Sequence, residues 1–160
     1  MTQRLNYVAH SSALYKKLND LSMAILKETS LDATWIHLLE IRASQLNGCA
    51  FCVDMHVKQA KLHGERELRI YHLPIWRESN LFSDKERAVL EWTEVVTKLP
   101  EHGISDEVFA RISEQLSEKE ISDLTFAIGT INAWNRLAIP FRSVPGSADA
   151  AYGLDKAGLK

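Results

Sequence analysis

Apolar residues recur three and four positions apart along most of this chain, and alternation with a period of two is absent. Such spacing gathers apolar side chains on one face of an α-helix. The first of these stretches begins near Ser12, and the second begins at Asp32, whose carboxylate suits a helix N-cap. The others run from the cysteines to about His63, over 65–71, from Ser83 to before Pro100, from Ser105, and from Ser117 to about Pro140. The pattern predicts an all-α fold, a helical bundle of about seven helices.

Local signals agree with two of these helix starts. Ser83 is followed three positions later by Glu86, and Ser117 by Glu120. In such a capping box each of the two side chains accepts a hydrogen bond from the other residue's backbone N–H, which fixes the first turn. Pro74 has the opposite effect, because proline lacks an N–H, and we expect a loop or a broken segment around it.

The chain has 160 residues, which fits one domain. We expect a single domain over 1–160, with a core of about 12–142 and a loose tail over 143–160, where small residues dominate. Lysine and arginine number 19 and acidic residues 21, so the charge gives no sign of a nucleic-acid or anionic-membrane partner. The N-terminus lacks the apolar stretch of a secretory signal, and no apolar run approaches the roughly 20 residues of a membrane span. We therefore expect a cytoplasmic protein, where a CxxC pair is more often catalytic or metal-binding than structural.

The chemistry centres on the stretch NGCAFCVDMH, which holds both cysteines of the chain. Asn47-Gly48 closes one predicted helix and Cys49 opens the next, and the positive end of the helix dipole lowers a thiol pKa. Cys52 and His56 are four residues apart, so the imidazole can take the thiol proton. The helix start favours Cys49 as the nucleophile, whereas the imidazole favours Cys52. We choose Cys52, because proton transfer needs hydrogen-bond reach while the dipole acts on both sulfurs.

Two other interpretations of these residues stand beside the redox one. The cysteines are small apolar residues that could simply fill a core. Alternatively, Cys49, Cys52 and His56 supply three zinc ligands, with a fourth from His37, Glu40 or His63. Structural zinc sites usually contain a second cysteine pair, which this chain lacks. Haem attachment needs histidine directly after the second cysteine, a position that Val53 occupies, so we expect no cofactor and no metal.

The segments IRASQLNGCAFCVDMHVKQA and INAWNRLAIPFR resemble the AhpD-like alkylhydroperoxidase family, in its single-domain branch, within the carboxymuconolactone decarboxylase superfamily. The likeness covers roughly Leu14 to Arg142. It implies an all-α fold and a homo-oligomer, a trimer or a hexamer. It also implies that Cys52 attacks the peroxide, Cys49 resolves the product and His56 belongs to a proton relay. The implied reductant is an external dithiol such as a lipoylated protein.

The chain departs from the family pattern at the acidic end of that relay. The family places glutamate twelve residues before the first cysteine, where this chain has His37. Glu40 follows about one helical turn later. Either His37 replaces the glutamate as a base, or Glu40 acts from a shifted position, or the peroxidase activity is weak. Asn132, Asn135 and Arg136, on one stripe of the last helix, are expected to hydrogen-bond between helices or subunits.

The sequence as a whole predicts a thiol-dependent peroxidase that reduces hydroperoxides through a dithiol–disulfide cycle. One alternative is a general disulfide reductase or a redox sensor that uses the same thiols. Another is a zinc-binding or purely structural oligomer without peroxidase activity. Self-association is also expected on physical grounds, since hydrophobic residues make up 46% of the chain and several helices are apolar on more than one face.

Overall fold

A computed structural model describes residues 2–159, and all regular secondary structure within them is helical, which confirms the all-α prediction. The longer helices are α2 (Ser12–Glu28), α3 (Ala33–Asn47), α4 (Ala50–Leu62), α6 (Asp84–Thr97), α7 (Asp106–Ser113) and α8 (Glu118–Phe141). The shorter ones are α1 (Tyr7–His10), α5 (Glu67–His72), α9 (Asp149–Tyr152) and the 3₁₀ helices η1 (Leu73–Glu78) and η2 (Leu154–Ala157). None of the helices in this part of the chain is both long and apolar enough to cross a membrane.

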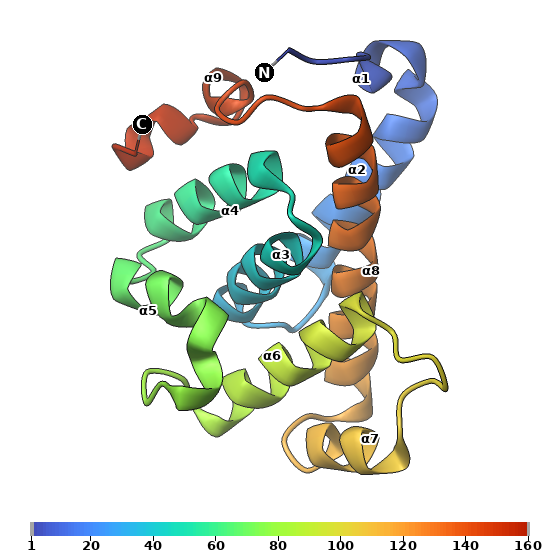
Figure 1. Cartoon of the computed structure of the whole chain (residues 1–160), viewed down its shortest axis with the longest axis vertical. Helices are drawn as coiled ribbons and strands as arrows, with labels where there is room; N and C mark the ends of the chain where they lie inside the picture. Colours follow the sequence, from blue (N-terminus) through green and yellow to red (C-terminus); the bar gives the residue numbers. More distant parts are fainter. Residues whose placement is uncertain (1, 160) are drawn as a thin grey trace.

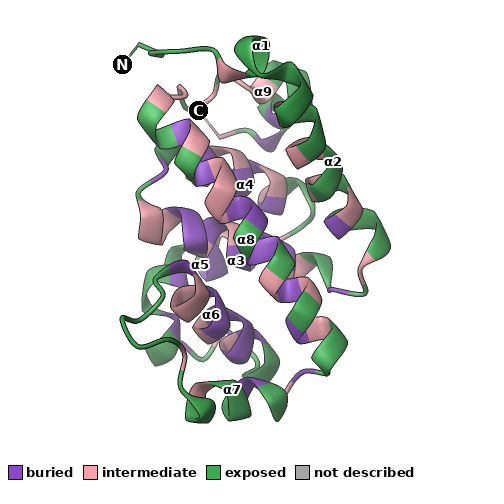
Figure 2. Cartoon of the chain, turned by 90° about the vertical axis from the view of Figure 1, so that its right-hand side faces the viewer, coloured by how far each residue is buried: buried purple, intermediate pink, exposed green. Residues whose placement is uncertain are grey.

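Helix α3 lies at the centre of the bundle and packs against α4, α6 and α8 (Figure 1). Its position follows from its composition, because apolar side chains surround it rather than forming one stripe. Leu38, Leu39 and Ile41 are fully buried on different sides of the helix. The outer helices are buried only on their inner faces, as the exposed turns of α2, α7 and α8 show (Figure 2).

The helix boundaries follow the local signals in the sequence. Both predicted capping boxes are formed, Ser83 with Glu86 and Ser117 with Glu120. Asp32 caps α3 by accepting a hydrogen bond from the backbone N–H of Thr34 at 2.7 Å. These contacts involve neighbours in the sequence, which is why a sequence pattern could identify them.

The segment around Pro74 is more ordered than the loop or broken segment we expected. It forms the 3₁₀ helix η1, with irregular backbone angles at Ile75. Trp76 anchors it, because its ring is buried and its indole N–H donates to the Glu94 carboxylate at 2.9 Å. The tertiary contacts of one tryptophan therefore order a segment whose local sequence disfavours an α-helix.

The expectation of a loose tail over 143–160 is wrong for the part that the structure describes. Residues up to 159 fold back along α4, and Leu154 is only 2% exposed. Asp54 on α4 accepts a hydrogen bond from the backbone N–H of Gly146 at 2.9 Å. Lys58, also on α4, lies between Asp54 and Asp149, at 2.9 and 2.7 Å. These long-range polar contacts hold a segment whose small residues gave no sign of order.

We expect Asp149→Ala to loosen this tail. The change removes one of the two carboxylates that bind the nearly buried Lys58 ammonium, whose side chain is 5% exposed. The free energy of unfolding should fall by roughly 1–2 kcal/mol, and amide hydrogen exchange should accelerate over residues 146–157. The matched control is Asp20→Ala, because the Lys16–Asp20 pair is exposed and should contribute little. Unchanged exchange in the Asp149 variant would show that the ion pair does not hold the tail.

Candidate active site

The turn between α3 and α4 places both cysteines at the start of a helix. Gly48 ends α3 with φ at 72°, a left-handed conformation that glycine adopts without steric cost. Cys49 is the N-cap of α4, and its Sγ accepts a hydrogen bond from the backbone N–H of Cys52 at 3.3 Å. The two cysteines are joined by a disulfide. Both sulfurs therefore lie at the positive end of the α4 dipole, as the sequence predicted.

Both cysteines are buried in the protein interior. Cys49 and Cys52 are each 2% exposed and belong to the main apolar cluster of the core, against which Phe51 and Trp134 pack. A reagent in solution reaches these two residues readily only if the structure opens locally. The sequence offered burial of the cysteines only as one alternative, because it depends on how α8 packs against the α3–α4 turn.

His56 lies one turn after Cys52 on α4, and its ring makes a polar contact with α3. Its Nδ1 lies 3.0 Å from Oε2 of Glu40 and 2.8 Å from Oε1 of Gln59. The ring is 5% exposed, and Nε2 is buried with no hydrogen-bond partner among residues 2–159. Glu40 and Gln59 thus orient the imidazole through one nitrogen and leave the other free.

The charge on His56 depends on Glu40. Burial by itself lowers the pKa of His56, because an imidazolium loses its hydration in the protein interior. The nearby Glu40 carboxylate and the hydrogen bonds to Glu40 and Gln59 outweigh burial, so the pKa of His56 is raised above 6.5. The pair favours a protonated ring, which can donate a proton from Nε2.

His37, the other candidate for the acidic end of the relay, lies elsewhere. Its ring packs on His63 with centroids 4.8 Å apart, at a polar pocket of about 380 Å³. The ring is 6% exposed, and neither nitrogen has a hydrogen-bond partner within the described chain. Burial lowers the pKa of His37, which favours the neutral ring. Of the two alternatives left open by the sequence, the structure brings Glu40 and not His37 into contact with His56.

Side-chain amides of α8 hold the turn that carries Cys49. The Asn47 amide donates to Oδ1 of Asn132 and to Oδ1 of Asn135, both at 2.8 Å. Asn135 in turn donates to the Ser44 hydroxyl at 3.1 Å. The expected role of these asparagines in bonding between helices is confirmed. Gln59 was missed by the sequence interpretation, although its position three residues after His56 on one helix was an available signal.

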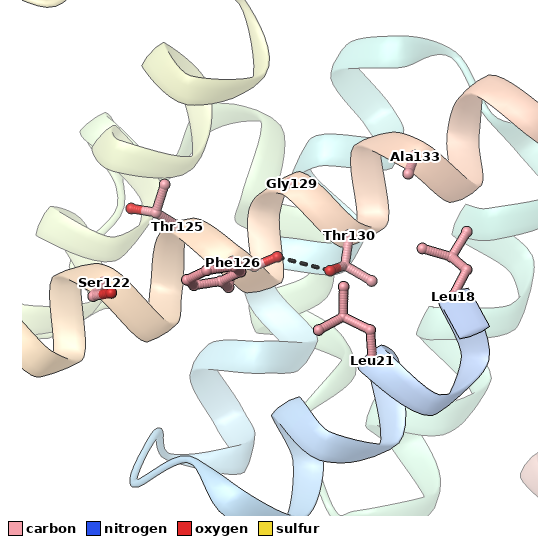
Figure 3. A pocket seen from close by; sticks show the side chains of 8 residues that line it. All are labelled: Leu18, Leu21, Ser122, Thr125, Phe126, Gly129, Thr130 and Ala133. Carbon is pink, nitrogen blue, oxygen red and sulfur yellow. Dashed lines mark hydrogen bonds between the residues drawn. The ribbon is translucent and has the colours of Figure 1, made fainter.

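The described residues contain no set of side chains that fits the zinc interpretation. Among residues 2–159, no group of three or more histidine, cysteine, aspartate or glutamate side chains is arranged to hold a metal ion. Another hollow in the described surface is an apolar groove of about 510 Å³ between α2 and α8, shown in Figure 3. Leu18, Leu21 and Phe126 line it, and none of its lining residues belongs to the thiol site.

Comparison with known proteins decides the family. The model of the carboxymuconolactone decarboxylase family matches residues 12–95, a segment that contains the thiol pair, His56 and Glu40. The chain belongs to this family. The chain is also similar to the uncharacterized protein YdfG of Bacillus subtilis, to which it is 40% identical over 139 residues, 87% of this chain and 94% of YdfG.

Solved structures place this family member in the AhpD-like group. One is a protein of unknown function from Agrobacterium tumefaciens, named as a candidate AhpD antioxidant-defence protein. It is 42% identical, with a TM-score of 0.86 over 90% of this chain and 98% of its own. The debrominase Bmp8 shares the fold with a TM-score of 0.79, over 94% of this chain and 80% of its own, at 18% identity. The predicted AhpD-like membership is confirmed.

Proposed function

We propose that this protein is a thiol-dependent peroxidase that reduces a hydroperoxide through a cycle of the Cys49–Cys52 pair. The observation that carries the proposal is the buried contact between His56 and Glu40, one helical turn beyond Cys52. A carboxylate-oriented imidazole one helical turn from a thiol at a helix start is an arrangement that can activate a cysteine nucleophile. The resemblance to AhpD-like proteins points to the same chemistry.

The first step is the reaction of Cys52 with the peroxide. Cys52 reacts as a thiolate whose negative charge is balanced by the protonated His56 ring, and its sulfur attacks the terminal oxygen of the hydroperoxide. The O–O bond breaks, the departing alkoxide takes the proton from Nε2 and leaves as an alcohol, and Cys52 is oxidised to a sulfenic acid. Glu40 stabilises the imidazolium and holds Nδ1, so the free nitrogen is the one available for the transfer.

The second step closes the disulfide. The sulfur of Cys49 attacks the sulfenic sulfur of Cys52, a water molecule leaves, and the two sulfurs bond. An external dithiol then restores both thiols through a mixed disulfide, supplying two electrons and two protons. We infer that this reductant is a small dithiol such as that of a lipoylated protein. Because Cys49 and Cys52 are each only 2% exposed, each reaction requires local opening at the start of α4.

Thiol titration with mass spectrometry tests this function. The reduced protein is treated with one equivalent of cumene hydroperoxide, and the masses of the chain and of its cysteine peptide are compared before and after. We expect both free thiols to disappear and the mass to fall by that of two hydrogens. A protein that ignores the peroxide but loses its thiols rapidly to a small disulfide such as oxidised glutathione would instead be a disulfide reductase or a redox sensor. Retention of both thiols in both reactions would contradict all redox roles.

Self-association as a trimer or hexamer stays a prediction, as does the cytoplasmic location. What supports self-association is the number of apolar side chains that α2 and α8 leave uncovered. Leu14 is 69% exposed, Leu26 53% and Phe126 62%. Such side chains are costly to leave in water when they gather on one face, so a second copy of the chain is a suitable cover.

A further inference from the structure

We propose that the amide cluster of Asn47, Asn132 and Asn135 positions Cys49 and thereby sets how readily the Cys49–Cys52 pair closes its disulfide. The inference rests on the proposed dithiol–disulfide cycle and adds a group of positioning residues to it. None of the three asparagines needs to touch the peroxide. They act through the turn that connects α3 to α4.

The two cysteines are held in different ways. Cys52 is inside α4, so the helix fixes its backbone. Cys49 is the N-cap, outside the regular helix, and its backbone N–H donates to the carbonyl of Ser44 at 2.9 Å. The position of its sulfur therefore depends on the turn from Ser44 to Gly48. Whatever holds that turn controls the separation of the two sulfurs in the reduced protein.

The amide cluster joins both ends of this turn to α8. Asn47, directly before Gly48, donates to the side-chain oxygens of Asn132 and Asn135. Asn135 donates to the hydroxyl of Ser44, the residue whose carbonyl binds Cys49. Asn132 extends the cluster to α6 by donating to the Thr97 hydroxyl at 3.1 Å. Three helices thus fix one short turn.

Burial makes these contacts hard to break. Ser44 and Asn135 are 0% exposed, and each amide in the cluster has a partner. Opening the bond between Asn135 and Ser44 leaves buried polar groups without a partner, which is unfavourable. The turn is consequently held in one conformation, in which the Cα atoms of Cys49 and Cys52 are 5.3 Å apart. That separation lies within the range of about 4.4–6.8 Å that disulfides need.

A fixed turn matters because disulfide closure is an intramolecular reaction. Two thiols held at the right separation react with a high effective concentration, and a mobile turn lowers it. The reaction that reports this concentration is exchange with glutathione. Two glutathione thiols reduce the protein disulfide, their own sulfurs bond to each other, and two electrons and two protons pass to Cys49 and Cys52. The equilibrium constant measures how strongly the protein favours its own disulfide.

The test compares Asn135→Ala and Asn47→Ala with the unaltered protein in glutathione redox buffers. We expect each variant to shift the equilibrium about tenfold towards the dithiol, which corresponds to a potential about 30 mV less negative. The rate at which iodoacetamide alkylates Cys52 should rise where the turn opens more readily, but the pH midpoint of that rate should stay the same in both variants. These two results together would place the effect on Cys49 rather than on the His56–Glu40 pair.

The matched control is Thr125→Val, also on α8. It removes the hydrogen bond that the Trp92 indole donates to the Thr125 hydroxyl at 2.9 Å, and it leaves the turn untouched. The control should lower stability without moving the glutathione equilibrium. An equal shift in the control, or no shift in a folded Asn47→Ala protein, would overturn the proposal. Asn47 is only half-buried, so that variant is expected to fold even if Asn135→Ala does not. No peroxide is present, so this outcome is independent of whether the protein reduces peroxides.

Discussion

Replacing Cys52 with serine is expected to abolish peroxide turnover. A serine hydroxyl at that position stays protonated at neutral pH and is a far weaker nucleophile than a thiolate, so the first step cannot occur. The expected loss is complete within the sensitivity of a coupled assay that follows consumption of cumene hydroperoxide in the presence of a dithiol. The site lies in the core, so circular dichroism and a thermal melt should accompany the assay to show that the variant is folded.

The matched variant is Cys49→Ser, which keeps Cys52 and its contacts along α4. It should still react with one equivalent of peroxide, leaving a sulfenic acid that dimedone traps and mass spectrometry detects as an adduct on the Cys52 peptide. Steady turnover should stop, because no second sulfur in the chain resolves that product. Normal turnover in Cys52→Ser, or a dimedone adduct on Cys49 in that protein, would reverse the roles assigned to the two cysteines.

Glu40→Gln is expected to lower peroxide turnover by roughly one to two powers of ten. The change keeps the shape of the side chain but removes the charge that stabilises the protonated His56 ring, and general acid–base catalysis typically contributes about 10²- to 10⁴-fold. Burial then dominates, so the pKa of His56 should drop. Turnover against pH, together with the NMR titration of the His56 ring, measures both effects.

His37→Asn is the comparison that separates the two candidates for the relay. His37 makes no hydrogen bond within the described chain, and we expect a smaller effect on turnover than that of Glu40→Gln. Loss of turnover in His37→Asn with retention in Glu40→Gln would show that His37 is the base. Glu91→Gln, which alters an exposed pair with Arg111 at 2.7 Å, controls for the loss of a negative charge elsewhere.

The His56–Glu40 contact also predicts a pH dependence of stability. The pKa of His56 is raised in the folded protein above its unfolded value of about 6.5. A group of this kind contributes its full stabilisation below the unfolded pKa and loses it as the pH rises through the folded pKa. From about pH 5 upward, where carboxylates are ionised, the difference in unfolding free energy between the unaltered protein and Glu40→Gln should therefore be largest at low pH. A difference that grew with pH would contradict the raised pKa.

The sequence identified the cysteines and His56 as one group and Glu40 as a candidate partner, but it could not show that Glu40 contacts His56. Cys49, Cys52 and His56 lie within eight positions of each other, so helical periodicity alone put them together. Glu40 is sixteen residues before His56 and reaches it only because α3 and α4 pack against each other. From the sequence, His37 and Glu40 were both candidates, one turn apart on the same helix. The rotation of α3 in the bundle decided between them.

Local chemistry by itself determined the helical class, the capped helix starts at Ser83 and Ser117, the glycine-terminated turn at Gly48 and the position of the thiols at the start of α4. All of these depend on contacts within a few residues of the chain. Only the tertiary structure decided that the cysteines are buried, that the segment from Gly146 to Ala157 packs along α4, and that three asparagines meet around the Cys49 turn. Those features arise between residues far apart in the sequence, where side-chain shape, charge pairing and the need to satisfy buried polar groups act only after the helices have packed.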